Sequence, residues 1–211
     1  MLTASMQGAV SRMRMPCSKT VKKQEIFSPR ELIAFREDPH AILLALSRGG
    51  VVVAYQLSLA LRLPLDLLIS RKIGAPGNPE YAVGSVSEGG GMYWNHQALA
   101  ALSLSERELD DTVRAQQREV ARRAALYRQG RPFPDHTDRA VILVDDGLAT
   151  GATFFAAVAT ARRHHPRRVI GAIPIGAQSS GDEARRLVDE MIVLRVLRVP
   201  ERFYAIGKLL P

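Results

Sequence analysis

Residues 141–153 read VILVDDGLATGAT, and this stretch decides the fold of the chain. Its first four residues are apolar and do not alternate with polar ones, which is typical of a strand covered on both faces in a parallel sheet flanked by helices. Two carboxylates follow, Asp145 and Asp146, and then a turn of small residues opens a predicted helix from Phe154 to Arg163. Ligands bind at the carboxyl ends of parallel strands, so a binding site is expected at this turn.

The residue types in the turn suit a phosphorylated ribose. Ionised Asp145 and Asp146 only accept hydrogen bonds, as the vicinal hydroxyls of a ribose require. Glycine lets the backbone approach a ligand, threonine hydroxyls donate, and free N–H groups at a helix N-terminus favour a phosphate. The predicted 5-phosphate loop comprises Gly147, Leu148, Ala149, Thr150, Gly151, Ala152 and Thr153. The alternative is an ordinary strand, turn and helix cap of an α/β protein.

An earlier strand, glycine turn and helix repeat this arrangement. Residues 41–46 form a second buried-strand run, and a helix is predicted from about Val51 to Leu61. The guanidinium in the turn between them can bind a phosphate through two parallel hydrogen bonds. This turn consists of Ser47, Arg48, Gly49 and Gly50. A surface turn with a solvated arginine is the alternative.

A third apolar run, residues 65–70, ends in Arg71 and Lys72. Prolines and glycines crowd residues 73–80, and they argue against a helix or a central strand there. Together with residues 81–91, this stretch has the composition of a mobile lid or of an extended hairpin. The candidate lid residues are Arg71, Gly74, Asn78 and Glu80.

A long helix is predicted from Ser105 to Gln129. Ser105 and Glu108 match a capping box, and prolines at 132 and 134 follow the helix. Apolar side chains recur at steps of three, four and seven, so they trace one stripe that is expected to face the core. The stripe comprises Leu109, Val113, Val120, Ala124 and Tyr127.

The rest of the chain continues the alternation of strand and helix. We predict a strand from Arg168 to Ile175, a helix from Asp182 to Glu190 and a last strand from Met191 to Leu197. This order predicts an α/β fold with an open, doubly wound, mostly parallel sheet flanked by helices.

These segments together resemble the type I phosphoribosyltransferases, enzymes that use phosphoribosyl pyrophosphate (PRPP). The resemblance covers roughly residues 42–207, and VILVDDGLATGAT is its most specific part. Residues 71–80, RKIGAPGNPE, are similar to a bacterial subgroup of predicted phosphoribosyltransferases whose acceptor is not generally assigned. This chain departs from that subgroup at Ser47, where proline is usual, in residues 1–40, where only Pro29 to Glu37 suggest a short helix, and after residues 203–207, where relatives commonly continue with a helix.

The resemblance implies a reaction and a set of roles. The phosphoribosyl group of PRPP is transferred to a nitrogen of a nucleobase or related amine, and pyrophosphate is released. The turn of residues 47–50, here called the pyrophosphate turn, is implied to hold the pyrophosphate of PRPP, and Asp145 and Asp146 to bind the ribose. Arg48 and Lys72 are implied to act as catalytic groups that stabilise charge on the leaving pyrophosphate, with Arg71 as a weaker candidate.

The resemblance also implies partners of this site. Mg²⁺ arrives bound to PRPP rather than on protein ligands and acts as a Lewis acid and template. The lid excludes water from the reaction, the loop of residues 175–180 approaches the acceptor, and the protein forms a homodimer.

The composition is that of one folded domain, residues 29–211, after a basic tail, residues 1–28, which is expected to be disordered. The 211 residues are 46% hydrophobic and 24% charged, with a mean hydropathy of −0.04, and a domain of this size needs no disulfide or metal to be stable. Cys17 is the single cysteine, which excludes an internal disulfide and agrees with a cytoplasmic location. No apolar run reaches the roughly 18 residues of a membrane-spanning helix, so no membrane partner is expected.

The formal net charge of +8 raises the alternative of a nucleic-acid partner. The densest basic cluster, residues 162–168, follows a predicted helix, where cations complement the helix C-terminus. No aromatic interleaving or nucleic-acid motif accompanies it, and a positive field also steers an anionic substrate. The alternatives to the enzyme are a PRPP-sensing regulator that binds nucleic acid and a degenerate, non-catalytic paralogue.

Overall fold

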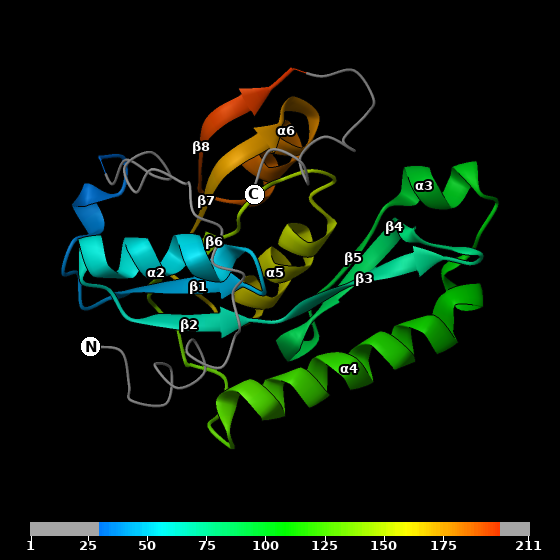
Figure 1. Ribbon diagram of the computed structural model, residues 1–211, viewed down its shortest axis with the longest axis horizontal. Helices are drawn as coiled ribbons and strands as arrows, with labels where there is room; N and C mark the ends of the chain where they lie inside the picture. The colour runs from blue at the N-terminus through cyan, green and yellow to red at the C-terminus, as the bar shows by residue number, and fades with distance from the viewer. Residues whose placement is uncertain (1–29, 199–211) are drawn as a thin grey trace, which may run out of the picture.

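Five parallel strands form the main sheet of the computed structural model, which describes residues 30–198 (Figure 1). Their order across the sheet is β2 (Leu65–Leu68), β1 (Ala41–Leu46), β6 (Ala140–Val144), β7 (Arg168–Ala177) and β8 (Glu190–Leu197). The chain therefore moves outward in one direction from β1 to β2, and in the opposite direction from β6 to β8. This is the strand order of a doubly wound sheet, and it confirms the predicted fold class.

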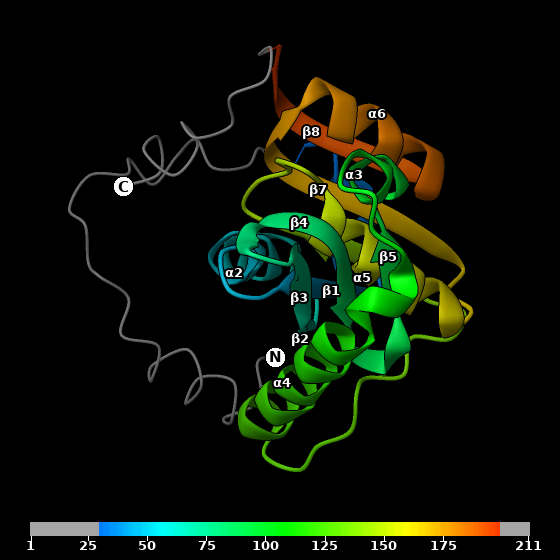
Figure 2. The ribbon, with the colours of Figure 1, turned by 90° about the vertical axis from the view of Figure 1, so that its right-hand side faces the viewer.

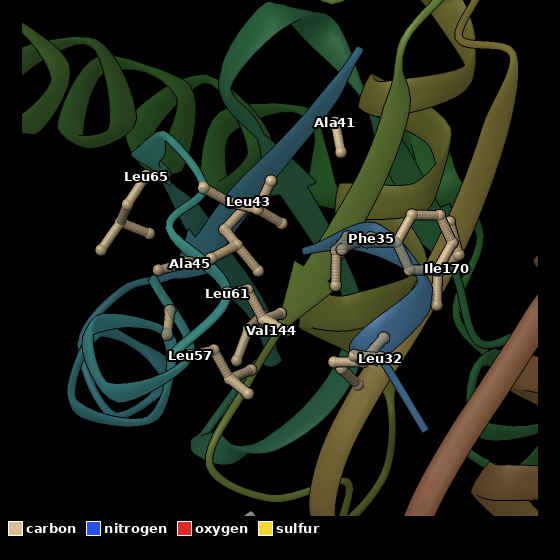
Figure 3. Close-up of a cluster of buried hydrophobic side chains, with 14 of the residues drawn as sticks. Leu32, Phe35, Ala41, Leu43, Ala45, Leu57, Leu61, Leu65, Val144 and Ile170 are labelled. Carbon is tan, nitrogen blue, oxygen red and sulfur yellow. The ribbon is translucent and has the colours of Figure 1, made fainter. Parts of the chain in front are cut away.

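Helices cover both faces of the main sheet. One face is covered by α2 (Gly50–Leu61) and the short 3₁₀ turn η1 (Ile33–Phe35), and the other by α5 (Ala152–Arg163) and α6 (Gln178–Leu187). All residues of β1 are buried, because Leu43 packs into the cluster on the α2 side and Leu44 into the cluster on the α5 side. Figure 3 shows the first of these clusters, which includes Leu32, Phe35, Leu57, Leu61 and Val144.

Three antiparallel strands form a second, smaller sheet: β3 (Ser70–Ala75), β4 (Asn78–Ser87) and β5 (Met92–Trp94). The helix α4 (Asp110–Arg128) lies along it, as the long green helix of Figures 1 and 2. The apolar stripe predicted for this helix is confirmed, because its residues pack with Ile73, Val83 and Val86 of the second sheet. The remaining short elements are η2 (Glu88–Gly90), α3 (His96–Ala101) and η3 (Glu106–Leu109).

The stretch predicted as a turn-rich lid is largely a hairpin. Residues 73–80 belong mostly to β3 and β4, and only Pro76 and Gly77 lie between the two strands. Ala75 pairs with Asn78 and Gly74 pairs with Ala82, so the residues between Asn78 and Ala82 have no partner on β3. Pro79 is tolerated because it lies in this bulge, where no ladder hydrogen bond is required. The extended hairpin, which was the alternative to a mobile lid, is therefore what this stretch forms. The expectation of no central strand was wrong, because β4 lies between β3 and β5.

Several predicted boundaries differ from the structure. The run 65–70 is broken, because β2 ends at Leu68 and Ser70 already begins β3, which places Arg71 and Lys72 in the second sheet. The helix predicted for 182–190 is Gln178–Leu187, because Glu190 pairs with Ile170 and starts β8.

The other two predicted helices are also altered. The long helix is η3 followed by α4, and its capping box is confirmed, since the backbone N–H and the hydroxyl of Ser105 both donate to the Glu108 carboxylate at 2.8 and 2.7 Å. The short helix predicted within 29–37 is reduced to η1. The predicted tail, Cys17 and residues 203–207 lie outside the described residues. Within residues 30–198, no helix is both long and apolar enough to span a bilayer.

Candidate functional site

The loops after β1 and β6 leave the main sheet at neighbouring positions. β1 and β6 pair in parallel, so their carboxyl ends lie side by side. After β1 the chain enters α2 on one face of the sheet, and after β6 it enters α5 on the other face. The point at which a doubly wound sheet diverges in this way is a crevice in which ligands bind.

Two glycines allow the two loops to touch. A Cβ atom on Gly49 would collide with the carboxylate of Asp146. A Cβ atom on Gly50 would lie 2.5 Å from the carbonyl oxygen of Val144 and 2.8 Å from the Cα atom of Asp145. The pyrophosphate turn therefore packs directly against the acidic pair, and the Ser47–Arg48 peptide bond within the turn is cis.

A cavity of about 250 Å³, here called the ribose cavity, opens between these loops. Nearly all residues predicted for the ribose, the 5-phosphate and the pyrophosphate line it, together with Lys72 from β3. Gly50 and Ala152 do not, because each is buried at the first turn of its helix. The lining residues are Leu46, Ser47, Arg48, Gly49, Ser70, Lys72, Asp145, Asp146, Gly147, Leu148, Ala149, Thr150, Gly151 and Thr153. The structure thus brings these residues together, while their individual roles stay predictions.

The predicted 5-phosphate loop is held in shape by its neighbours. Leu148 is buried, its N–H donates to the carbonyl of Ile175 and its carbonyl accepts from the N–H of Ala177, both at 2.9 Å. The hydroxyl of Ser180 donates to the carbonyl of Ala149. Gly151 has φ +76°, and a Cβ there would also collide with the ring of Phe155. The loop therefore reaches the N-terminus of α5 in a conformation that only glycine allows.

The acidic pair is strained electrostatically without a ligand. Burial raises the pKa of Asp145 well above its ordinary value, and the neighbouring Asp146 carboxylate raises this pKa further. The N–H of Asp146 donates to Oδ1 of Asp145 at 2.9 Å, which partly offsets both effects. A ligand that brings hydroxyl donors or a cation to this pair would favour its ionised form.

Two cations line the ribose cavity together with the acidic pair. They are Arg48 and Lys72, and within residues 30–198 neither forms a salt bridge with a carboxylate of the chain. A ligand that carries both hydroxyls and phosphates matches a cavity lined by carboxylates and cations.

The acidic pair offers oxygen donors of the kind that Mg²⁺ prefers. No group of three or more histidine, cysteine, aspartate or glutamate side chains suited to a metal occurs in the part of the chain that the structure describes. The donor set therefore fits a divalent cation whose remaining oxygen ligands come from a bound substrate.

A second cavity of about 560 Å³, here called the side chamber, adjoins the ribose cavity between the second sheet and α4. Three lid candidates, Arg71, Gly74 and Glu80, line it, whereas Asn78 at the start of β4 lines neither cavity. Its α4 residues are Thr112, Gln116 and Arg123, which lie in the helix for which the sequence predicts only an apolar stripe facing the core. These residues are four and seven positions apart, so they lie on one face of the helix. The sequence does not single out this face as part of a site, because a polar stripe beside an apolar one ordinarily faces solvent. Residues 175–180, predicted near the acceptor, line neither of the two cavities.

Comparisons with known proteins agree with this geometry. A family model described as "Phosphoribosyl transferase domain" matches residues 30–204. Two relatives from Mycobacterium tuberculosis strains, each named "Putative phosphoribosyl transferase", are 38% identical over 167 residues, which is 79% of this chain but 37% of each relative. The chain thus spans little more than a third of their length. The crystal structure of TT1426 from Thermus thermophilus is 36% identical, with a TM-score of 0.63 over 84% of both chains.

Proposed function

This chain belongs to the phosphoribosyl transferase family, and from that premise we propose that it transfers the phosphoribosyl group of PRPP to a nitrogen acceptor and releases pyrophosphate. One observation carries the proposal. The loops after β1 and β6 bring two carboxylates, the N-terminus of α5 and Arg48 to one cavity, and β3 adds Lys72. Each of these groups suits a different part of PRPP.

The 5-phosphate binds in the loop of residues 147–153. Free backbone N–H groups at the start of α5 and the hydroxyls of Thr150 and Thr153 donate to it. Asp145 and Asp146 accept hydrogen bonds from the ribose hydroxyls, and this relieves the repulsion that raises the pKa of Asp145. The pyrophosphate lies against the turn of residues 47–50.

The transfer breaks the bond between the anomeric carbon and the pyrophosphate oxygen, and the electron pair leaves with pyrophosphate. The acceptor nitrogen forms the new bond to the anomeric carbon and loses its proton to solvent. Arg48 and Lys72 stabilise the negative charge that grows on the leaving group, and one such donor is worth about 2.7–4 kcal/mol. Mg²⁺ bound with PRPP neutralises phosphate charge and orients the pyrophosphate.

The hairpin β3–β4 shields the pyrophosphate from water. Lys72 on β3 lines the ribose cavity, so the hairpin borders the reacting group directly. Excluding water prevents hydrolysis of PRPP without transfer. A homodimer and a cytoplasmic location stay predictions for this protein.

Pyrophosphate release tests the proposal. PRPP and Mg²⁺ are mixed with the protein and a panel of nucleobases and small nitrogen heterocycles and amines, and phosphoribosylated products are identified by mass spectrometry. We expect release that depends on the acceptor and that Asp146→Asn abolishes. The control is Asp182→Asn, because Asp182 is an exposed carboxylate on α6 that pairs with Arg185, away from the cavity.

Two results would contradict the proposal. One is release no faster than in buffer with every acceptor of the panel. The other is equal release by Asp146→Asn and Asp182→Asn, because the acidic pair would then have no part in the reaction.

A further inference from the structure

The side chamber is continuous with the ribose cavity. Ser47, Ser70, Lys72 and Thr153 line both. The hydroxyl of Ser47 is buried at this junction and has no hydrogen-bond partner among residues 30–198. Buried polar atoms are nearly always paired, so an unpaired hydroxyl on a residue that borders both cavities favours a ligand at their junction.

The side chamber is strongly cationic. Arg71, Lys72 and Arg123 line it, against the single carboxylate of Glu80 among the described lining residues. The side chains of Thr112 and Gln116 add polar groups from α4. Among those same described residues none is aromatic, so the chamber offers no ring on which a nucleobase could stack. Its chemistry fits a small anion.

The two arginines are held in place by their Nε atoms. Nε of Arg71 donates to Oε1 of Gln116 at 2.9 Å, and Nε of Arg123 donates to Oε1 of Glu119 at 2.7 Å. Each of these bonds uses one of the five N–H donors of its guanidinium, and the side chain of Arg123 is only 23% exposed. Both guanidinium groups are thus oriented in advance for a phosphate.

The chamber borders the turn that is proposed to hold the leaving group. Ser47 of the pyrophosphate turn lines both cavities, and so does Thr153 of the predicted 5-phosphate loop. An acceptor that displaces pyrophosphate must approach the anomeric carbon from the side opposite to the leaving oxygen. Pyrophosphate released from the turn is therefore the anion that can enter the chamber past Ser47.

We propose that the side chamber is a second pyrophosphate site, which receives pyrophosphate after the anomeric C–O bond has broken and holds it through Arg71 and Arg123. This inference rests on the proposed function. Arg123 is a product-binding residue in this account, and α4 is part of the site rather than a scaffold alone.

Calorimetric titrations of Arg123→Gln and Arg122→Gln test the proposal. Both arginines pair with Glu119, but Arg122 is 63% exposed and does not line the chamber, so each variant removes an ion-pair partner of Glu119 and only Arg123→Gln alters the chamber. The ligands are pyrophosphate with Mg²⁺, ribose 5-phosphate, and PRPP with Mg²⁺.

We expect Arg123→Gln to weaken pyrophosphate binding about tenfold, as the loss of one hydrogen bond to a charged group predicts, and to leave the affinities for ribose 5-phosphate and PRPP unchanged. Arg123→Lys should recover part of the lost affinity, and Arg122→Gln should match the unaltered protein.

Equal pyrophosphate affinity in the two glutamine variants would overturn the proposal. An equal loss for PRPP or for ribose 5-phosphate would also overturn it, because the chamber would not then be specific for the released product. If the unaltered protein binds no PRPP, the proposed function itself fails, and this result is distinct from the other two.

Discussion

At the scale of single residues, the acidic pair of the site lowers the stability of the folded protein. Asp145 is placed beside Asp146 and partly buried, so its pKa is raised in the folded chain. A carboxyl whose folded pKa lies above its unfolded pKa binds protons more tightly when folded. The free energy of unfolding therefore falls as the pH rises from the unfolded pKa, about 3.9, through the folded pKa. Near neutral pH the raised pKa of Asp145 therefore costs stability, which a ligand that favours the ionised carboxylate restores.

Asp145→Asn should therefore stabilise the protein without ligand and weaken PRPP binding at once. We expect a higher Tm near neutral pH, by about 2–4 °C for each kcal/mol relieved, and no gain below about pH 3, where the carboxyl is protonated in both states. Thermal unfolding followed across pH measures both. Asp182→Asn, at an exposed position, should change neither the Tm nor the binding. A lower Tm for Asp145→Asn at neutral pH would show that the carboxylate does not destabilise the protein without ligand.

At the scale of elements, the site depends on how closely two loops approach each other. The pyrophosphate turn reaches the acidic pair only because Gly49 and Gly50 lack side chains. The two strands that carry these loops are paired along their whole length, so neither loop can retreat without disturbing the sheet. An added methyl group must therefore displace the Asp146 carboxylate itself.

Gly49→Ala should weaken PRPP binding at least tenfold with little loss of folded structure, because the clash falls on a side chain of the site. Gly181→Ala is the matched control: Gly181 lies within α6, a Cβ there meets only the side chain of Arg185 at 3.8 Å, and alanine should stabilise the helix by about 0.5–1 kcal/mol. Titration and thermal unfolding of both variants provide the measurement. Unchanged PRPP affinity in Gly49→Ala would mean that the position of Asp146 is not critical.

The sequence alone predicts the strands and helices of the main sheet and the residues that meet at its edge, because these follow from apolar runs and from turn chemistry within a few residues. It does not decide between a mobile lid and an extended hairpin for residues 73–91, since Pro79 is accommodated by a bulge that exists only once β4 pairs with β3. Nor does it predict that Arg123 lines a cavity, because that depends on where α4 docks. Arg128 falls at the spacing of the apolar stripe of α4. A charged residue at that position is nevertheless expected to face solvent, and only the structure shows that its partners are buried.

At the scale of the whole molecule, one buried arginine joins the two sheets. Arg128 at the end of α4 donates to Asp66 of β2 at 2.6 Å, to the carbonyl of Leu67 at 2.6 Å and to Glu88 of η2 at 2.7 Å. Its side chain is only 6% exposed and lies 5.0 Å from the ring centre of Phe133. This network fixes α4, and with it the side chamber, to the sheet that carries the ribose cavity.

Arg128→Met should lower the free energy of unfolding by about 3 kcal/mol, because it leaves two partly buried carboxylates without their cation. The comparison is Arg114→Met, whose exposed pair with Asp111 on the same helix should contribute less than about 1 kcal/mol. Urea unfolding of the two variants gives both values. Equal costs would mean that the network does not hold the sheets together.

The basic cluster at residues 162–168 also has a structural explanation at this scale. Arg162 pairs with Asp189, Arg167 with Asp38 and Arg168 with Glu190, at 3.0, 3.5 and 2.9 Å. Much of its charge is thus matched by neighbouring carboxylates. These ion pairs favour a structural role for the cluster over a role as a nucleic-acid surface. The ribose cavity is therefore the main candidate for a functional site.

The most direct test of the account is a calorimetric titration of the folded protein with PRPP and Mg²⁺, with ribose 5-phosphate and pyrophosphate titrated separately. We predict one saturable PRPP site, weaker binding of each fragment, and loss of PRPP binding in the variant with both Asp145→Asn and Asp146→Asn. Absence of binding to all three ligands by a protein shown to be folded, or PRPP affinity that survives the double substitution, would contradict the assignment of this site.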